Sequence, residues 1–232
     1  MGDLAETQLV NAIDALRHGN SEMAACVIEH DKKIDALETE IETYSVNLIA
    51  LRQPMADDLR GVIAALKVSG NIERIGDYAK NIAKRTITLA KTPSIGASVG
   101  TIARMGVVVE GMIKNVLDAY VRRDADMADD VRLRDQEVDQ IHSSLFRELL
   151  TYMMEDPRNI GTCTHLLFIA TTRVANKMSA FRAVRMVRIS VSKNFTAHRS
   201  YGKGRRESGP FDRMVLCYSA LALSLRPLLG GT

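Results

Sequence analysis

An acidic ladder lies within a long helical pattern in the first half of this chain. Glu73, Asp77 and Asn81 recur every four residues, a spacing that stacks their side chains along one face of an α-helix. Two carboxylates one turn apart are hard oxygen ligands that could bind a metal ion. Apolar residues recur at threes and fours on the opposite face, which predicts that this face is buried: Ile72, Ile75, Ala79, Ile82 and Leu89.

The residues of the ladder leave two interpretations open. The ladder can be an ordinary solvated face, on which nearby cations relieve the repulsion between carboxylates; Arg74, Lys80 and Lys84 are the candidates. It can instead be part of a metal site. Taken alone, the ladder favours the solvated face, because acidic residues are common on exposed helix surfaces.

Three helices are predicted before residue 92. The first covers residues 3–17, the second begins at a cap formed by Asn20 or Ser21, and the third covers about residues 56–90. Gln53-Pro54 ends the second helix after about Arg52, because proline cannot continue the helical hydrogen-bond ladder. The predicted buried stripe of the second helix is Ile34, Leu37, Ile41, Tyr44, Leu48 and Leu51, and the acidic residues on its flank are Asp31, Asp35, Glu38 and Glu42.

The same pattern restarts after about residue 100. At a constant offset of 104 residues, Asp31 and Asp35 correspond to Asp135 and Asp139. A repeat of about 100 residues with three helices in each unit predicts an all-α fold of two tandem three-helix bundles. The expected units are residues 1–92 and 101–195, the second with an atypical last helix after about residue 171, and a basic, irregular tail over residues 196–232.

The composition limits the classes of protein to which the chain can belong. Aromatic residues make up 5% of the 232 residues and tryptophan is absent, which is typical of helices packed on helices. The longest uncharged apolar run, Met214 to Leu225, is too short to span a bilayer. The scattered cysteines argue against a disulfide framework or a zinc site and favour a reducing, cytosolic compartment: Cys26, Cys163 and Cys217.

No sequence motif favours an enzyme. The chain has no glycine-rich phosphate loop of the Walker type, and no Ser or Cys nucleophile stands in a recognisable setting. A ferritin-like di-iron oxidase needs paired Glu-x-x-His motifs, whereas residues 1–170 offer only Asp139-Gln140-Ile141-His142. The histidines of this region are interpreted as surface or hydrogen-bonded residues and not as ligands: His18, His30, His142 and His165.

Two sets of motifs, one in each repeat, are specific enough in combination to indicate a family. The first set is Gln53-Pro54-Met55-Ala56-Asp57-Asp58-Leu59-Arg60, Leu66-Lys67, Glu73-Arg74-Ile75-Gly76-Asp77 and Asn81-Ile82. The second set is Asp135-Gln136-Glu137-Val138-Asp139, Phe146-Arg147-Glu148-Leu149-Leu150-Thr151-Tyr152-Met153, Asp156-Pro157-Arg158 and Leu166-Leu167-Phe168-Ile169-Ala170. Over about residues 1–170, the chain resembles the PhoU family.

The resemblance implies a cytoplasmic regulator of phosphate uptake that is usually a homodimer. Members of the family restrain the phosphate ABC transporter and its partner sensor histidine kinase, and so keep the phosphate-starvation genes off when phosphate is plentiful. Several members bind metal ions such as Fe, Mn, Mg or Zn through acid-x-x-x-Asp motifs. Carried over by position, the implied ligands are Asp31, Asp35, Glu73 and Asp77 in the first repeat and Asp135 and Asp139 in the second.

The chain departs from the family pattern at both ends. It begins at Met1-Gly2-Asp3-Leu4, where the family has a further stretch of first helix, so we expect a truncated start or an internal methionine taken as the start. From Pro54, which corresponds to Pro157, the offset is 103 residues, so Glu73 and Asp77 correspond to positions near Asn176 and Ala180, where no carboxylate is found. A complete metal site is therefore expected in the first bundle only.

The charge balance changes where the resemblance stops. Residues 1–170 hold 19 Lys and Arg against 26 Asp and Glu, whereas residues 171–232 hold 12 against two. Two explanations are a divergent basic tail and a reading-frame shift near residue 171. The frame shift is our hypothesis, because Arg-, Ser- and Gly-rich text poor in acids is typical of a GC-rich gene read out of frame.

Two further functions compete with the metal-binding regulator. The cluster Lys203-Gly204-Arg205-Arg206 attracts phosphate backbones without sequence preference, but no helix-turn-helix or stacking aromatics accompany it, so no specific nucleic acid is expected. The stronger alternative is a helical adaptor or scaffold protein that works without metal. Like the regulator, it would act by binding partners and not by turning over a substrate.

Overall fold

The computed structural model describes residues 1–172, apart from 93–95, 125, 128–129 and 132–133. This part of the chain is helical, without a β-strand among the residues described, and the expected all-α class is confirmed. The atypical last helix, the basic tail and the frame-shift hypothesis all concern residues beyond 172 and lie outside the described part. The expected division into domains stays a prediction.

The first repeat consists of three helices, and their bounds agree with the predicted ones to within one residue. Helix α1 covers Gly2–His18, α2 covers Ser21–Arg52 and α3 covers Ala56–Leu89. The Asn20 carboxamide caps α2, since its Oδ1 accepts hydrogen bonds from the backbone N–H groups of Glu22 and Met23 at 3.0 Å. At the other end of α2, Gln53 has a φ of 45° and directs the chain into Pro54.

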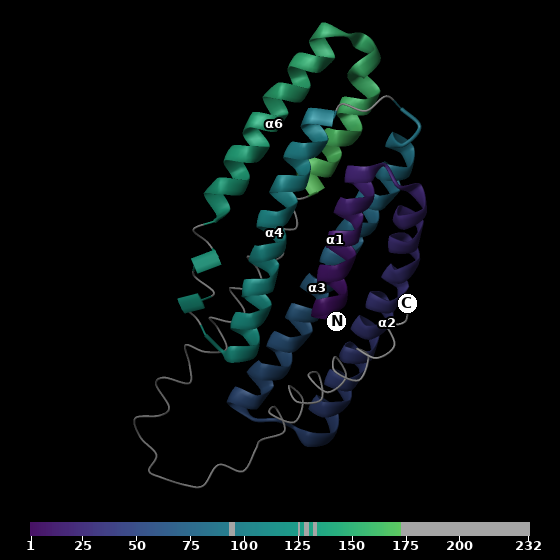
Figure 1. Cartoon of the computed structure of the whole chain (residues 1–232). Helices are drawn as coiled ribbons and strands as arrows, with labels where there is room; N and C mark the ends of the chain where they lie inside the picture. Colours follow the sequence, from purple (N-terminus) through teal and green to yellow (C-terminus); the bar gives the residue numbers. More distant parts are fainter. Residues whose placement is uncertain (93–95, 125, 128–129, 132–133, 173–232) are drawn as a thin grey trace, which may run out of the picture.

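The second repeat follows with helices of similar order (Figure 1). Helix α4 covers Gly96–Arg122, α6 covers Asp135–Glu155, the short 3-10 helix η1 covers Pro157–Asn159, and residues 160–172 are again helical. We refer to this last segment as helix 160–172.

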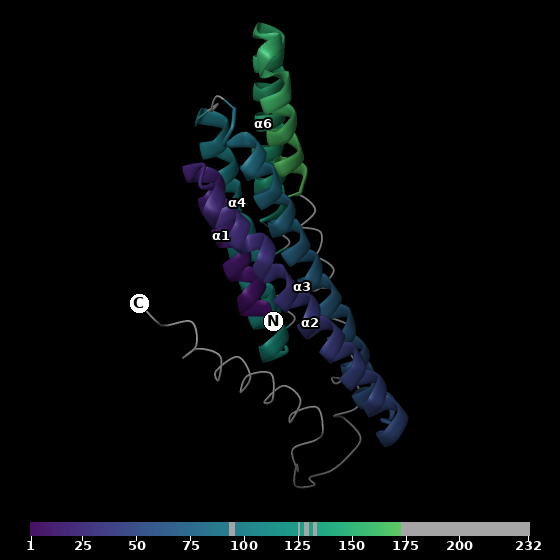
Figure 2. The same ribbon diagram turned by 90° about the vertical axis from the view of Figure 1, so that its right-hand side faces the viewer.

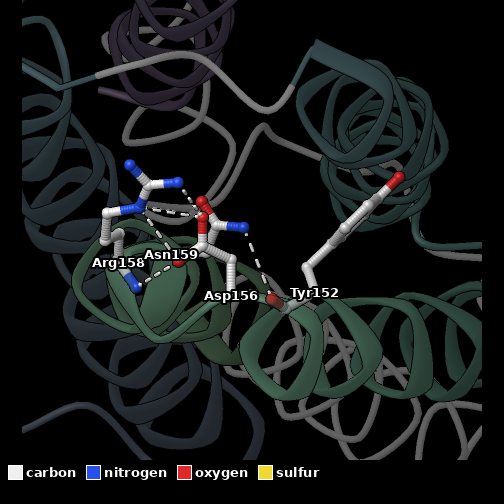
Figure 3. Close-up of polar contacts among 4 residues, drawn as sticks. All are labelled: Tyr152, Asp156, Arg158 and Asn159. Atoms are coloured by element: carbon white, nitrogen blue, oxygen red, sulfur yellow. Dashed lines mark hydrogen bonds and ion pairs between the residues drawn. The ribbon is translucent and has the colours of Figure 1, made fainter.

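Side-chain hydrogen bonds stabilise the turn between α6 and helix 160–172 (Figure 3). The Asp156 carboxylate accepts the backbone N–H of Arg158 at 2.9 Å and pairs with the Arg158 guanidinium, whose Nη2 lies 2.9 Å from Oδ2. The Asn159 side-chain N–H group donates to the Tyr152 carbonyl at 3.4 Å and thereby satisfies a carbonyl in the last turn of α6. The Asp156-Pro157-Arg158 motif thus ends one helix and starts the next.

A single hydrophobic core runs through both repeats. Helix α1 packs on α2 and α3 within its own repeat and also on α4 of the second repeat. Helix α3 reaches the second repeat as well, because the Arg85 guanidinium lies 4.2 Å from the centre of the Phe168 ring and 3.3 Å from His165 Nδ1. The largest fully buried side chains come from both repeats: Leu9, Ile34, Ile82, Ile102, Met105, Met112, Ile113, Leu145, Leu149, Leu166 and Ile169.

The predicted buried stripe of α2 is wrong at Tyr44 and Leu51, whereas Leu48 is partly buried. Ile34 is fully buried, but the Tyr44 side chain is 56% exposed and Leu51 is 82% exposed. The cause is the length of the neighbouring helix: the 17 residues of α1 span about 26 Å, whereas the 32 residues of α2 span about 48 Å. Figure 2 shows the ends of α2 and α3 projecting beyond α1.

Candidate metal centre

Helices α2 and α3 run antiparallel, and they approach each other closely at Gly76. A Cβ atom added to Gly76 would lie 2.9 Å from Cδ1 of Ile34 and 3.2 Å from Oδ1 of Asp31, both on α2. The absence of a side chain at Gly76 therefore lets α3 lie directly against Asp31. Six residues earlier on α3, a Cβ atom at Gly70 would lie 3.4 Å from Glu38 Oε1, so the acidic residues of α2 follow α3 along this contact.

The contact brings the two predicted acidic ladders together around one lysine. Asp31 is buried, with only 1% of its side chain exposed, and its Oδ2 lies 2.5 Å from the Nζ atom of Lys80. The same ammonium lies 3.3 Å from Asp77 Oδ1 and donates a hydrogen bond to it. Lys80 therefore bridges α2 and α3, and it is the candidate cation that the structure places on the carboxylates.

Burial and neighbouring carboxylates raise the pKa values of Glu73 and Asp35. Partial burial raises the pKa of Glu73 to about 7, helped by the charge of Asp77, a hydrogen bond to Asp77, and the charges of Glu38 and Asp35. Burial first and then the negative charge of Asp31 raise the pKa of Asp35, although Lys80 opposes this shift. We use the word groove for the α2–α3 contact that carries Asp31, Asp35, Glu38, Glu73, Asp77 and Lys80. This contact holds more negative charge than one lysine neutralises.

Lys80 stays protonated throughout the physiological pH range. Its short ion pair with Asp31 is the largest effect that raises the pKa of Lys80 to about 12, while partial burial acts in the opposite direction. A lysine beside two carboxylates has this behaviour because each negative charge favours the ammonium form. The ion pair is therefore a permanent part of the groove.

By type, the oxygen donors of the groove fit a hard divalent cation. Asp35, Glu38, Glu73 and Asp77 offer carboxylates from two facing helices, the donor class that Mg²⁺ and Mn²⁺ prefer. Oδ1 of buried Asp31 has no hydrogen-bond partner in the described part of the structure. However, no three of the described His, Cys, Asp or Glu side chains lie close enough together to hold an ion as they stand. Binding would require these side chains to reorient.

The structure brings together the first-repeat candidates but does not test those of the second. Asp139 is exposed on α6, and Asp135 begins that helix, although its side chain is not among the described ones. The positions that correspond to the third-helix acids, near Asn176 and Ala180, lie outside the described residues. Lys80 was predicted only as one of three candidate cations, and Glu38 was not predicted as part of the site. Glu38 continues the spacing of Asp31 and Asp35, and this pattern could have identified it.

The histidines are placed as expected for surface or hydrogen-bonded residues, with one exception. His18 Nδ1 lies 2.9 Å from the Asp14 carbonyl, His30 is exposed, and His165 contacts Arg85. His142 differs, because its Nε2 is buried without a hydrogen-bond partner in the part of the chain described.

We expect Glu73→Gln to stabilise the protein above about pH 7, measured with a chelator present. The carboxyl of Glu73 has a pKa of about 7 in the fold and an ordinary value of 4.5, so the folded state binds its proton more tightly. Wild-type stability is then lost as the pH rises from 4.5 through 7, whereas glutamine cannot ionise. Because Glu73 is only partly buried, we discount the shift and expect a difference of about 1 kcal/mol at pH 8 that vanishes near pH 4.5.

Urea unfolding at a series of pH values would measure this difference. The matched control is Glu40→Gln, which removes the same charge from an exposed position on α2. If the stability of both variants has the same pH dependence as that of the wild type, the neighbours of Glu73 do not raise its pKa.

Comparison with known proteins identifies relatives along most of the chain. The family model described as the PhoU domain matches residues 1–86 and 102–173. A phosphate-specific transport system accessory protein PhoU homolog of Caulobacter vibrioides is 49% identical over 170 residues, which cover 73% of this chain and 74% of the relative. The homolog of the same name from Zymomonas mobilis is 53% identical over 170 residues, 73% of this chain and 71% of the relative.

Solved structures agree with the sequence relatives. PhoU from Pseudomonas aeruginosa superposes with a TM-score of 0.78 at 35% identity, over 83% of this chain and 92% of that one. The phosphate transport system regulatory protein PhoU from Streptococcus pneumoniae gives a TM-score of 0.75 at 25% identity, over 83% and 90%. Among the described residues, none of the helices is both long and apolar enough to cross a membrane.

Proposed function

Because this chain belongs to the PhoU family, we propose that it is a cytoplasmic negative regulator of phosphate uptake and of the phosphate-starvation response. The family match places it among accessory and regulatory proteins of phosphate transport and not among enzymes. The observation that carries the proposal is the match over both repeats, at 49% identity to an accessory protein of a phosphate-specific transport system.

The proposed action is binding to the phosphate ABC transporter and to its sensor histidine kinase, as a homodimer. The helical architecture of the described residues supports this action, because a helical bundle offers long surfaces for protein contacts. The projecting ends of α2 and α3 expose large apolar side chains such as Leu51 and Met55, which suit contact with another protein.

Deleting the gene is expected to raise phosphate-starvation phosphatase activity several-fold in high-phosphate medium. A negative regulator that is absent cannot keep the starvation genes off, and returning the gene should restore repression. Enzyme assays on whole cells grown at high and low phosphate would measure the effect. Equal activity in the deleted and parent strains at high phosphate would contradict the regulator assignment.

A divalent metal ion in the first repeat is the second part of the proposal. Asp35, Glu38, Glu73 and Asp77 would hold it, and the ion would neutralise the excess negative charge of the groove. Support comes from the raised pKa of Glu73, to which the charges of Asp77, Glu38 and Asp35 contribute after partial burial. The alternative is the metal-free adaptor, favoured by the Lys80 ion pair at one end of the groove.

Metal analysis of protein purified without chelator separates the two possibilities. The metal-binding form should lose its bound ion in the variant Glu73→Ala/Asp77→Ala. Glu40→Ala/Glu42→Ala removes the same number of carboxylates from exposed positions of α2 and is the matched control. Wild-type protein that carries no metal and still represses the phosphatase would establish the adaptor.

A further inference from the structure

The Asp31 carboxylate requires a permanent cation beside it because it is buried. A carboxylate removed from water loses its hydration, and the loss destabilises the fold unless an opposite charge or several hydrogen bonds replace it. The side chain of Asp31 is 1% exposed, and neither of its oxygens accepts a hydrogen bond of good geometry in the part of the chain described. Gly76 places the α3 backbone directly against Oδ1, so solvent is excluded on that side.

Lys80 supplies the charge from the facing helix. Its side chain crosses from α3 to α2, is 27% exposed, and is held by two carboxylates on different helices, Asp31 and Asp77. The hydrogen bond to Asp77, three residues earlier on the same helix, orients the Lys80 ammonium toward Asp31. We propose that Lys80 is a built-in counter-cation that occupies the position on Asp31 which a divalent metal ion would otherwise take.

This proposal explains why the described carboxylates do not converge as a metal cluster. A divalent ion bound to Asp31 would lie within a few ångströms of the ammonium, and the two positive charges would repel each other strongly at that distance. Any divalent ion is thereby excluded from Asp31 and restricted to Asp35, Glu38, Glu73 and the Asp77 oxygen that does not contact Lys80. The inference goes beyond the proposed function, because it holds whether or not the wild-type groove binds metal.

The test replaces Lys80 by methionine, which keeps most of the volume and the helix preference but removes the charge. In EDTA, Lys80→Met should lower the thermal midpoint by about 5 °C or more, since it leaves Asp31 buried without a partner. Saturating Mn²⁺ should restore most of this loss. After dialysis against Mn²⁺, the variant should carry about one more bound ion per chain than the wild type.

Three further variants decide between the possible causes. Lys84→Met removes the same charge from an exposed position one turn further along α3 and should leave both the midpoint and the Mn²⁺ content unchanged. Asp31→Asn/Lys80→Met removes the proposed ligand and should abolish the additional ion. Lys80→Gln retains a hydrogen-bond donor and supplies a folded neutral variant if methionine prevents folding.

The outcomes are distinct for the two proposals. An additional Mn²⁺ ion in Lys80→Met or Lys80→Gln supports the counter-cation, even if the wild type binds no metal and the metal part of the proposed function fails. The counter-cation is overturned if the Mn²⁺ content of these variants equals that of the wild type. It is also overturned if the Asp31→Asn double variant gains the same ion.

Discussion

Replacing Leu9 by alanine is expected to lower the free energy of unfolding by about 3 to 5 kcal/mol. Leu9 lies on α1 with none of its side chain exposed, and it is one of the largest fully buried side chains. The core to which it belongs also contains Met112 and Ile113 of α4. The truncation leaves a cavity where α1 meets its neighbours, and a close-packed interior cannot collapse to fill it completely.

The loss should affect both repeats together, because they share this core. We expect a single unfolding transition in urea, detected by far-ultraviolet circular dichroism. Its midpoint should be lower than in the wild type. Leu51→Ala is the matched control: it deletes the same atoms from a side chain that is 82% exposed and should change the stability by no more than about 0.5 kcal/mol. A transition that splits, with one half at the wild-type midpoint, would show that the repeats fold separately.

The helix bounds of the first repeat were predictable because local chemistry sets them. The amide side chain of Asn20 satisfies the free N–H groups at the start of α2, and Pro54 cannot continue the helix that ends at Arg52. Both effects act over a few residues, so the sequence contains all the information that they need. The buried stripe of α3, predicted from apolar periodicity, is also confirmed. Its residues Ile72, Ile75, Ala79 and Ile82 are buried, and Leu89 is partly buried.

The depth of burial along α2 was not predictable from periodicity. A repeat of threes and fours shows which face of a helix is apolar, but it does not show how far the neighbouring helix extends. Ile34 and Leu51 belong to the same stripe, yet α1 is too short to reach the second of them. Contacts with residues distant in sequence decide this point.

The candidate site was predicted in part. The spacing of Glu73 and Asp77 predicted an acidic face, and the repeat identified Asp31 and Asp35 as its counterpart. The choice among Arg74, Lys80 and Lys84 as the neutralising cation depends on how α2 and α3 are aligned, and Gly76 sets that alignment through a close approach. Helical spacing alone places all three cations near the ladder and cannot select one.

Leucine in place of Gly76 is expected to destabilise the fold by about 3 kcal/mol or more, the largest effect that we predict for the groove. Even a Cβ atom would lie 2.9 Å from the Ile34 side chain, which is fully buried and has no free space to enter. A leucine adds three further carbon atoms at this point and must push α2 away from α3. The displacement also separates Asp31 from Lys80, so a buried charge loses its partner.

The matched control is Gly100→Ala, because a Cβ atom at Gly100 meets no atom within 4 Å. That change should stabilise α4 by up to about 1 kcal/mol, since alanine loses less backbone freedom than glycine in a helix. Gly76→Ala should fall between the two and still destabilise. Urea unfolding should rank the stabilities of the three variants by the space available to each new side chain. If helix preference alone governed these positions, Gly76→Ala would instead stabilise as much as Gly100→Ala, and the close approach of α3 to Asp31 would not constrain the groove.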